Sequence, residues 1–270
     1  MKNFMIFLVG AFCALSVSAQ GVDSLANKPL TQAELEPSYS PEQAWSAANE
    51  AYIAGEFARA EELYERIVAD DKHSLKLYFN LANACFKQNK LGKAILYYNR
   101  ALLLSPGDED VRHNLAIAES LTKDRIEAVP EFFLKTWLRS VRNTLSCRSW
   151  TIMSLAMLAA VLILGLLFVL AQRLALRKTG FYGMLLMALL FVVTTWFAAS
   201  ARGAMLDREA AVVMSSTASV KSSPDRSATD LFVLHEGTTL HVVETLDEWS
   251  EVVIADGKKG WIESAKIEQI

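Results

Sequence analysis

Two trios of side chains that could bind a peptide recur 34 residues apart. Within each trio the spacing is i, i+4, i+7, which places all three side chains on one face of a helix. Aromatic rings provide contact area, and an asparagine amide can both donate to and accept from a peptide backbone. We therefore expect a groove that binds a protein segment. Its candidate residues are Trp45, Asn49, Tyr52, Phe79, Asn83 and Phe86, with Lys87 and His113 as polar groups at the rim.

A second interpretation applies to the aromatic members of these trios, because aromatic stripes at helical spacing often wedge neighbouring helices together. The asparagines are harder to explain by packing, so we assign Asn49 and Asn83 to the groove. On this hypothesis, replacing both with alanine abolishes partner binding and leaves thermal stability nearly unchanged. Equal loss of both properties would assign the pair to structure.

No constellation of residues predicts catalysis. None of the four histidines forms a ligand pair beside a cysteine or a carboxylate cluster, and neither a phosphate-binding glycine loop nor a G-x-S-x-G motif occurs. The acidic runs Glu61-Glu62 and Asp108 to Asp110 are expected as solvated helix faces and helix starts. We therefore predict a binding protein and not an enzyme, with no metal and no cofactor. The net charge of −3 argues against nucleic acid as a partner.

The interval of 34 residues extends to the segments that would carry the candidate groove. The phrases NLANA at 80–84 and NLAIA at 114–118 differ by one residue in their shared frame. Small residues at matching positions would let two helices approach closely, and a tyrosine would fill the space beside them. The matching pairs include Ala48 and Ala82, Ala60 and Ala94, and Tyr64 and Tyr98.

This pattern resembles the tetratricopeptide repeat, which has a 34-residue period and two helices in each unit. We predict two repeats and a capping helix over residues 41–126; an unrelated four- or five-helix bundle is the alternative. Cys85 occupies the place of a usual tyrosine and is expected to be a small buried hydrophobic residue. The resemblance implies that the concave surface of the array holds peptides or partner helices.

The N-terminus has the form of a secretory signal peptide over residues 1–19. Lys2 precedes the apolar run from Phe4 to Leu15, and small residues follow it. Phe12 before Cys13 disfavours a lipoprotein. Removal of this segment leaves two cysteines in unlike settings, which predicts no disulfide framework.

Two longer apolar runs, 149–172 and 179–201, can each cross a membrane as a helix. The loop between them, 173–178, has three cations and no acid, which suits the cytoplasm. Export by the signal peptide would then place both large flanks in the periplasm and the hairpin in the bacterial inner membrane. Neither run has a charged residue in its core, so anchoring is favoured over transport.

Residues 131–148 predict an amphipathic helix at the membrane surface. Phe133, Trp137, Val141 and Leu145 follow at spacings of four, with the arginines turned elsewhere. A continuous extension of the first membrane span is the alternative.

Residues 210–270 contain short β-type runs separated by turns. The stretch at 220–224 has the form VxSxP, Trp249 opens a later run, and DGKKGWI at 256–262 starts with a hairpin signal. This order resembles bacterial SH3-like barrels, which implies binding of wall components or neighbouring proteins. Trp249 and Trp261 suit the core as well as a site.

The predicted fold class is thus multi-domain: all-α helical repeats, a two-helix transmembrane hairpin and a small all-β barrel. This order of parts is similar to that of the Bacteroides aerotolerance operon E (BatE) proteins. The resemblance implies a periplasm-facing scaffold that works beside von Willebrand-type membrane proteins and a MoxR-type ATPase in oxygen or envelope stress. In the alternative function the barrel binds peptidoglycan, and the array serves as a spacing or oligomerisation device.

Overall fold

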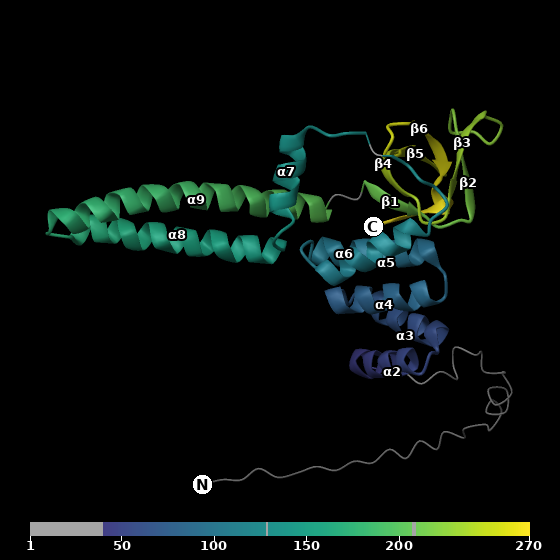
Figure 1. Ribbon diagram of the computed structural model, residues 1–270, viewed down its shortest axis with the longest axis horizontal. Helices are drawn as coiled ribbons and strands as arrows, with labels where there is room; N and C mark the ends of the chain where they lie inside the picture. The colour runs from purple at the N-terminus through teal and green to yellow at the C-terminus, as the bar shows by residue number, and fades with distance from the viewer. Residues whose placement is uncertain (1–39, 128, 207–208) are drawn as a thin grey trace, which may run out of the picture. The chain divides into compact units, whose positions relative to one another are not determined.

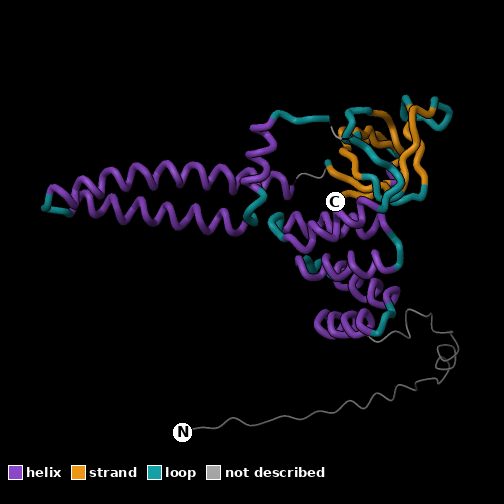
Figure 2. Tube along the Cα trace, in the orientation of Figure 1, coloured by secondary structure: helices purple, strands orange, loops and turns teal. Residues whose placement is uncertain are grey.

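The computed structural model describes residues 40–127, 129–206 and 209–270. In this part of the chain it contains helical repeats, a pair of long apolar helices and an antiparallel sheet, which is the predicted fold class. Figure 2 shows the separation into helical and strand-rich regions. The expected signal peptide at 1–19 lies outside the described residues.

The repeats form five helices, each packed against the next in sequence, as Figure 1 shows. Their bounds are α2 Pro41–Ile53, α3 Phe57–Ala69, α4 Leu75–Lys87, α5 Leu91–Leu104 and α6 Glu109–Ser120. Helices α2 to α5 form two helix pairs, and α6 is a further helix that packs against α5.

Side-chain caps fix where three of these helices begin. The Ser40 hydroxyl accepts from the Gln43 N–H, and the Gln43 side chain accepts from the Ser40 N–H, so that two otherwise unpaired donors are satisfied. Ser74 and Asp108 accept in the same way from backbone N–H groups three residues on. The expectation that the acidic run at Asp108 starts a helix is confirmed.

Small residues bring the paired helices together, as their spacing predicted. Ala48, Ala60, Ala82 and Ala94 are fully buried, and Tyr64 and Tyr98 fill the space beside them. Cys85 is also fully buried, and this burial raises the pKa of its thiol. It therefore behaves as the predicted small hydrophobic residue and not as a reactive thiol.

Glu61 corrects the expectation of a solvated acidic face on α3. Its side chain is buried and accepts from Lys93 Nζ at 2.7 Å and Gln88 Nε2 at 2.7 Å, with Lys90 as a further partner. Burial raises the pKa of this carboxyl, but the three donors more than offset that effect and hold the pKa below its usual range. Glu61 thus joins the two repeats. Of the acidic pair Glu61-Glu62, only Glu62 is exposed.

The two apolar helices, α8 Cys147–Leu170 and α9 Leu174–Leu206, pack along each other and are long and apolar enough to cross a membrane. Close approach at one end requires Gly180, because a Cβ there would lie 2.8 Å from the Phe168 backbone nitrogen. The connection is shorter than the expected loop at 173–178. Arg177 and Lys178 therefore lie in the first turns of α9.

Helix α7, Phe133–Arg142, is separate from α8 and does not extend it continuously. The chain turns after α7, and Ser146 caps the start of α8. Trp150 Nε1 donates to the Arg142 carbonyl oxygen at 2.9 Å, while its ring stacks on Phe197 with centroids 4.8 Å apart. These contacts join α7 to both apolar helices.

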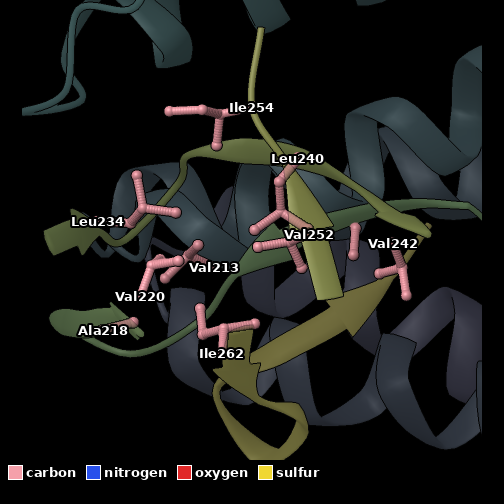
Figure 3. Packing of buried hydrophobic residues seen from close by; sticks show 10 residues of the cluster. Val213, Ala218, Val220, Leu234, Leu240, Val242, Val252, Ile254 and Ile262 are labelled. Atoms are coloured by element: carbon pink, nitrogen blue, oxygen red, sulfur yellow. The ribbon is translucent and has the colours of Figure 1, made fainter. Parts of the chain in front are cut away.

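The C-terminal strands form one antiparallel sheet in the order β3-β2-β6-β5-β4-β1-β7. Figure 3 shows its core, in which residues such as Val220, Leu240 and Ile262 face one another. Gly257 turns the predicted hairpin with φ +86°. The strands are β1 Ala210–Val213, β2 Thr217–Lys221, β3 Asp230–His235, β4 Thr239–Leu246, β5 Trp249–Val253, β6 Lys259–Glu263 and β7 Ile267–Gln269, with the short helix η1 Ser264–Lys266. Trp249 is buried and Trp261 is half-buried.

Candidate protein-binding groove

A hydrogen-bond network joins the first three helices of the array through one amide oxygen. Tyr64 of α3 donates its hydroxyl to Asn49 Oδ1 of α2 at 2.8 Å. Asn80 Nδ2 of α4 donates to the same oxygen at 3.2 Å. Burial raises the pKa of Tyr64, so its hydroxyl remains a donor at physiological pH.

The same network recurs one repeat later, on α4, α5 and α6. Tyr98 donates its hydroxyl to Asn83 Oδ1 at 2.6 Å, and Asn114 Nδ2 donates to that oxygen at 3.1 Å. Each residue stands 34 positions after its counterpart. The repeated NLANA and NLAIA phrases thus supply an asparagine that binds the asparagine of the preceding repeat.

These bonds give Asn49 and Asn83 a packing role that the sequence analysis did not assign to them. Their Oδ1 atoms are each shared by two donors from neighbouring helices. Within the described residues, the Nδ2 atom of Asn83 donates to no protein group. One amide atom therefore holds the helices, and the other is available to an acceptor on a ligand.

A hollow of ≈ 290 Å³ lies where α2, α4, α5 and α6 face one another. Four of the predicted groove residues line it: Tyr52, Asn83, Phe86 and Lys87. Tyr98, Asn114 and Ile117 complete its lining. Aromatic walls, an amide donor and the exposed Lys87 ammonium make this hollow suitable for a peptide with polar backbone groups and a nearby carboxylate.

The other four candidates lie elsewhere. Trp45 packs on Tyr64 with ring centroids 5.6 Å apart and lines a second hollow with His73 and Leu77. Phe79 packs on Tyr98 at 6.2 Å, one repeat later. These two contacts match the wedge interpretation of the aromatic stripe.

Asn49 belongs to the first network and lines neither hollow, and His113 is exposed outside both. The structure therefore brings Tyr52, Asn83, Phe86 and Lys87 to one site and separates Trp45, Asn49, Phe79 and His113 from it.

Three lining residues were missed by the sequence analysis. Asn114 had a signal, because it occupies the position in NLAIA that Asn80 occupies in NLANA. The repeat pattern predicts Tyr98 only as a packing residue. Ile117 carries no signal of its own, because an exposed isoleucine on a capping helix is ordinary surface composition.

Hydrogen bonds join the barrel to the array at several positions. Gly92 N–H, at the start of α5, donates to Glu236 Oε1 at 2.9 Å, and Arg100 Nη2 donates to the Gln269 carbonyl at 2.6 Å. Asp124 accepts from the His235 backbone N–H at 2.7 Å and from Thr238 Oγ1 at 2.7 Å. None of these residues lines the hollow at Asn83, so the barrel leaves that groove accessible.

Comparison with known families supports both modules. Residues 46–109 match the tetratricopeptide repeat family model, and residues 216–268 match the bacterial SH3 domain model. A search of curated proteins finds no match. The repeat indicates protein–protein interaction and the bacterial SH3 domain is consistent with cell-wall binding; both are typically non-catalytic binding domains.

Proposed function

We propose that this chain is a membrane-anchored scaffold that binds a segment of a partner protein in the groove formed by Tyr52, Asn83, Phe86 and Lys87. The observation that carries the proposal is the groove itself, in which the Asn83 Nδ2 atom, without an acceptor among the described residues, lies between aromatic walls. An extended segment would accept from that amide and cover the rings. Lys87 favours a segment with an acidic residue or a carboxylate end.

The finer proposal is that the protein belongs to the aerotolerance type and resides in the bacterial inner membrane. The expected signal peptide and the basic residues Arg173, Arg177 and Lys178 at one end of the helix pair support a periplasmic array and barrel. The order of parts, similar to BatE proteins, supports von Willebrand-type membrane proteins as partners and a role in envelope stress.

The groove is tested by capture of partners from solubilised envelope with the full-length protein. We expect Phe86→Ala combined with Lys87→Glu to reduce capture of von Willebrand-type membrane proteins at least tenfold, because it removes an aromatic wall and reverses the rim charge. These positions take no part in the asparagine networks, so the array should stay folded.

Lys76→Glu provides the matched control, because Lys76 is an exposed lysine on the same helix and lines no part of the hollow. It should capture as the wild type does. If the double variant captures as much of these membrane proteins as the wild type does, the groove is rejected as the binding site, while the association with these proteins stands.

The second candidate function is binding of peptidoglycan through the barrel, and the match to the bacterial SH3 domain favours it. Co-sedimentation of the full chain with purified cell wall tests this function. Retention that is unaffected by the groove substitutions, together with no capture of membrane proteins, would make the barrel the principal binding domain.

A further inference from the structure

Helix α7 and the C-terminal half of α9 line an open hollow of ≈ 400 Å³. Leu138 and Val141 of α7 pack against the cluster of Trp150, Phe197 and Ala201. The bond from Trp150 Nε1 to the Arg142 carbonyl fixes the end of α7 in place. The hollow is therefore framed by contacts between helices.

Its lining combines apolar and cationic side chains. The apolar ones include Phe132, Leu138, Trp196 and Phe197, and the cations are Lys135, Arg139 and Arg142. Glu131 pairs with Lys135 at 3.1 Å and with Arg139 at 3.0 Å. One carboxylate is thus shared by two of the three cations.

Arg142 has no carboxylate partner within the described residues. Its Nε donates to Asn143 Oδ1 at 3.1 Å, and this neutral partner does not balance the charge of the guanidinium. Partial burial, aided by the charge of Arg139, lowers the pKa of Arg142, which is the response of a cation that lacks an anion. An anion placed between Arg139 and Arg142 would balance the charge of the partly buried Arg142 guanidinium and so offset the free-energy cost of its burial.

The surroundings indicate what kind of molecule carries the anion. Phe132 is 68% exposed, Phe133 73% and Trp137 58%, and Trp196 on α9 is 52% exposed. Aromatic side chains of this kind concentrate at the depth of lipid headgroups, while the outer surface of α9 beyond them is apolar. Of these four, Phe132 and Trp196 line the hollow. A small inorganic anion would leave these two rings uncovered, whereas a lipid would cover them.

We propose that the hollow between α7 and α9 binds an anionic phospholipid, with the phosphate at Arg142 and Arg139 and the acyl chains along the apolar surface of α9. This inference rests on the proposed membrane anchoring. A bound lipid would contact α7 and α9 together. The lipid would therefore stabilise the position of α7 beside the helix pair.

Native mass spectrometry of the full-length protein released from neutral detergent tests the site. Phosphatidylglycerol and phosphatidylcholine with identical acyl chains are added at equal concentration. We expect the wild type to retain at least fivefold more phosphatidylglycerol, and Arg142→Gln to fall to the phosphatidylcholine level. Arg142→Lys should preserve most of the preference, because the positive charge remains.

Arg148→Gln is the matched control, because Arg148 is an exposed arginine in the first turn of α8 that does not line the hollow. It should bind as the wild type does. Retention of the preference by Arg142→Gln, equal binding of the two lipids, or full displacement of the lipid by inorganic phosphate would each overturn the proposal. Should Arg142→Gln misfold by circular dichroism, loss of the preference in a folded Arg142→Lys variant would overturn it equally.

Membrane fractionation separates this inference from the proposed function. Arg142→Gln should remain in the membrane fraction and should still capture partners through the groove. A wild-type protein found outside the membrane fraction would contradict the anchoring. If the wild-type protein shows no lipid preference but fractionates with the membrane and captures partners, the lipid site is rejected and the proposed function stands.

Discussion

The amide of Asn83 divides its hydrogen-bonding capacity between the fold and the groove. Its oxygen accepts from Tyr98 and Asn114, and its nitrogen has no acceptor in the described protein. A part-buried donor left without its acceptor costs free energy, so loss of Oδ1 affects two helices at once. A substitution that removes only one of the two amide atoms can therefore separate binding from stability at Asn83. Alanine cannot, because it removes both atoms.

We predict that Asn83→Ala lowers the free energy of unfolding of the array by about 1–3 kcal/mol, because the Tyr98 and Asn114 donors lose their shared acceptor. Asn83→Asp should cost less stability, since an oxygen remains, yet should weaken partner binding because the Nδ2 donor is gone. Hydrogen exchange of α4 to α6, measured beside partner capture, checks both expectations. Equal stability loss in the two variants would contradict the division of roles.

At the scale of elements, the segment that follows α6 and the β3–β4 turn are joined by one carboxylate. Asp124 accepts from the His235 N–H, the His235 ring and Thr238. Gly237, in the same turn, has φ +87° and approaches so closely that a Cβ would lie 2.8 Å from Thr122 Cγ2. The contact is both hydrogen-bonded and tightly packed, so the barrel and the array should resist separation.

We predict that Asp124→Ala accelerates hydrogen exchange of the β3–β4 turn roughly 10- to 100-fold, because several bonds to a largely buried carboxylate are worth about 1.5–3 kcal/mol. Asp110→Ala, at an exposed acid in α6, should leave the turn unchanged. Burial raises the pKa of Asp124, but its bonds from Thr238 and His235 lower the pKa below its usual range.

The depressed pKa fixes the sign of the pH dependence. The contribution of Asp124 is present at neutral pH and is lost as the pH falls through its native pKa, below the ordinary aspartate value of about 3.9. Protection of the turn, corrected for intrinsic exchange, should fall in this acid range in the wild type. A similar acid-induced loss in Asp124→Ala would assign the effect to another group.

At the scale of the whole molecule, two apolar helices separate the array from the barrel in sequence, yet both modules contact each other. A helix pair with a short connection returns the chain to the side from which it entered. This geometry is compatible with the array and the barrel on one face of a membrane. The cations Arg173, Arg177 and Lys178 mark the opposite end of the pair.

We predict that a membrane-impermeant maleimide labels Glu62→Cys and Ser227→Cys in spheroplasts, in a background that lacks Cys147. Both positions are exposed, one on the array and one on the barrel. Lys178→Cys should be labelled only after the membrane is permeabilised. The reverse pattern would place both modules in the cytoplasm and remove the support for a periplasmic role.

The sequence by itself determined the helical repeats, the apolar pair and the strand-rich end, because each follows from a local pattern. The 34-residue interval predicted Ala82 and Ala94 at a helix contact, and the Asp-Gly pair predicted the hairpin at Gly257. Periodicity of this kind reports which face of a helix or strand is buried. The same periodicity placed Tyr52 on the predicted groove face of one helix, and Asn83 and Phe86 on that of another.

Only the tertiary structure decided which of those residues share a site and which groups are paired. Trp45 and Phe79 pack on repeat tyrosines, and Glu61, expected in solvent, is buried among donors from the next repeat. Asp124 meets His235 across 111 positions of sequence. The physical reason is that hydrophobic spacing encodes the orientation of one element, whereas a polar partner is set by the packing of several elements. No local sequence pattern specifies the distance between polar groups on different elements.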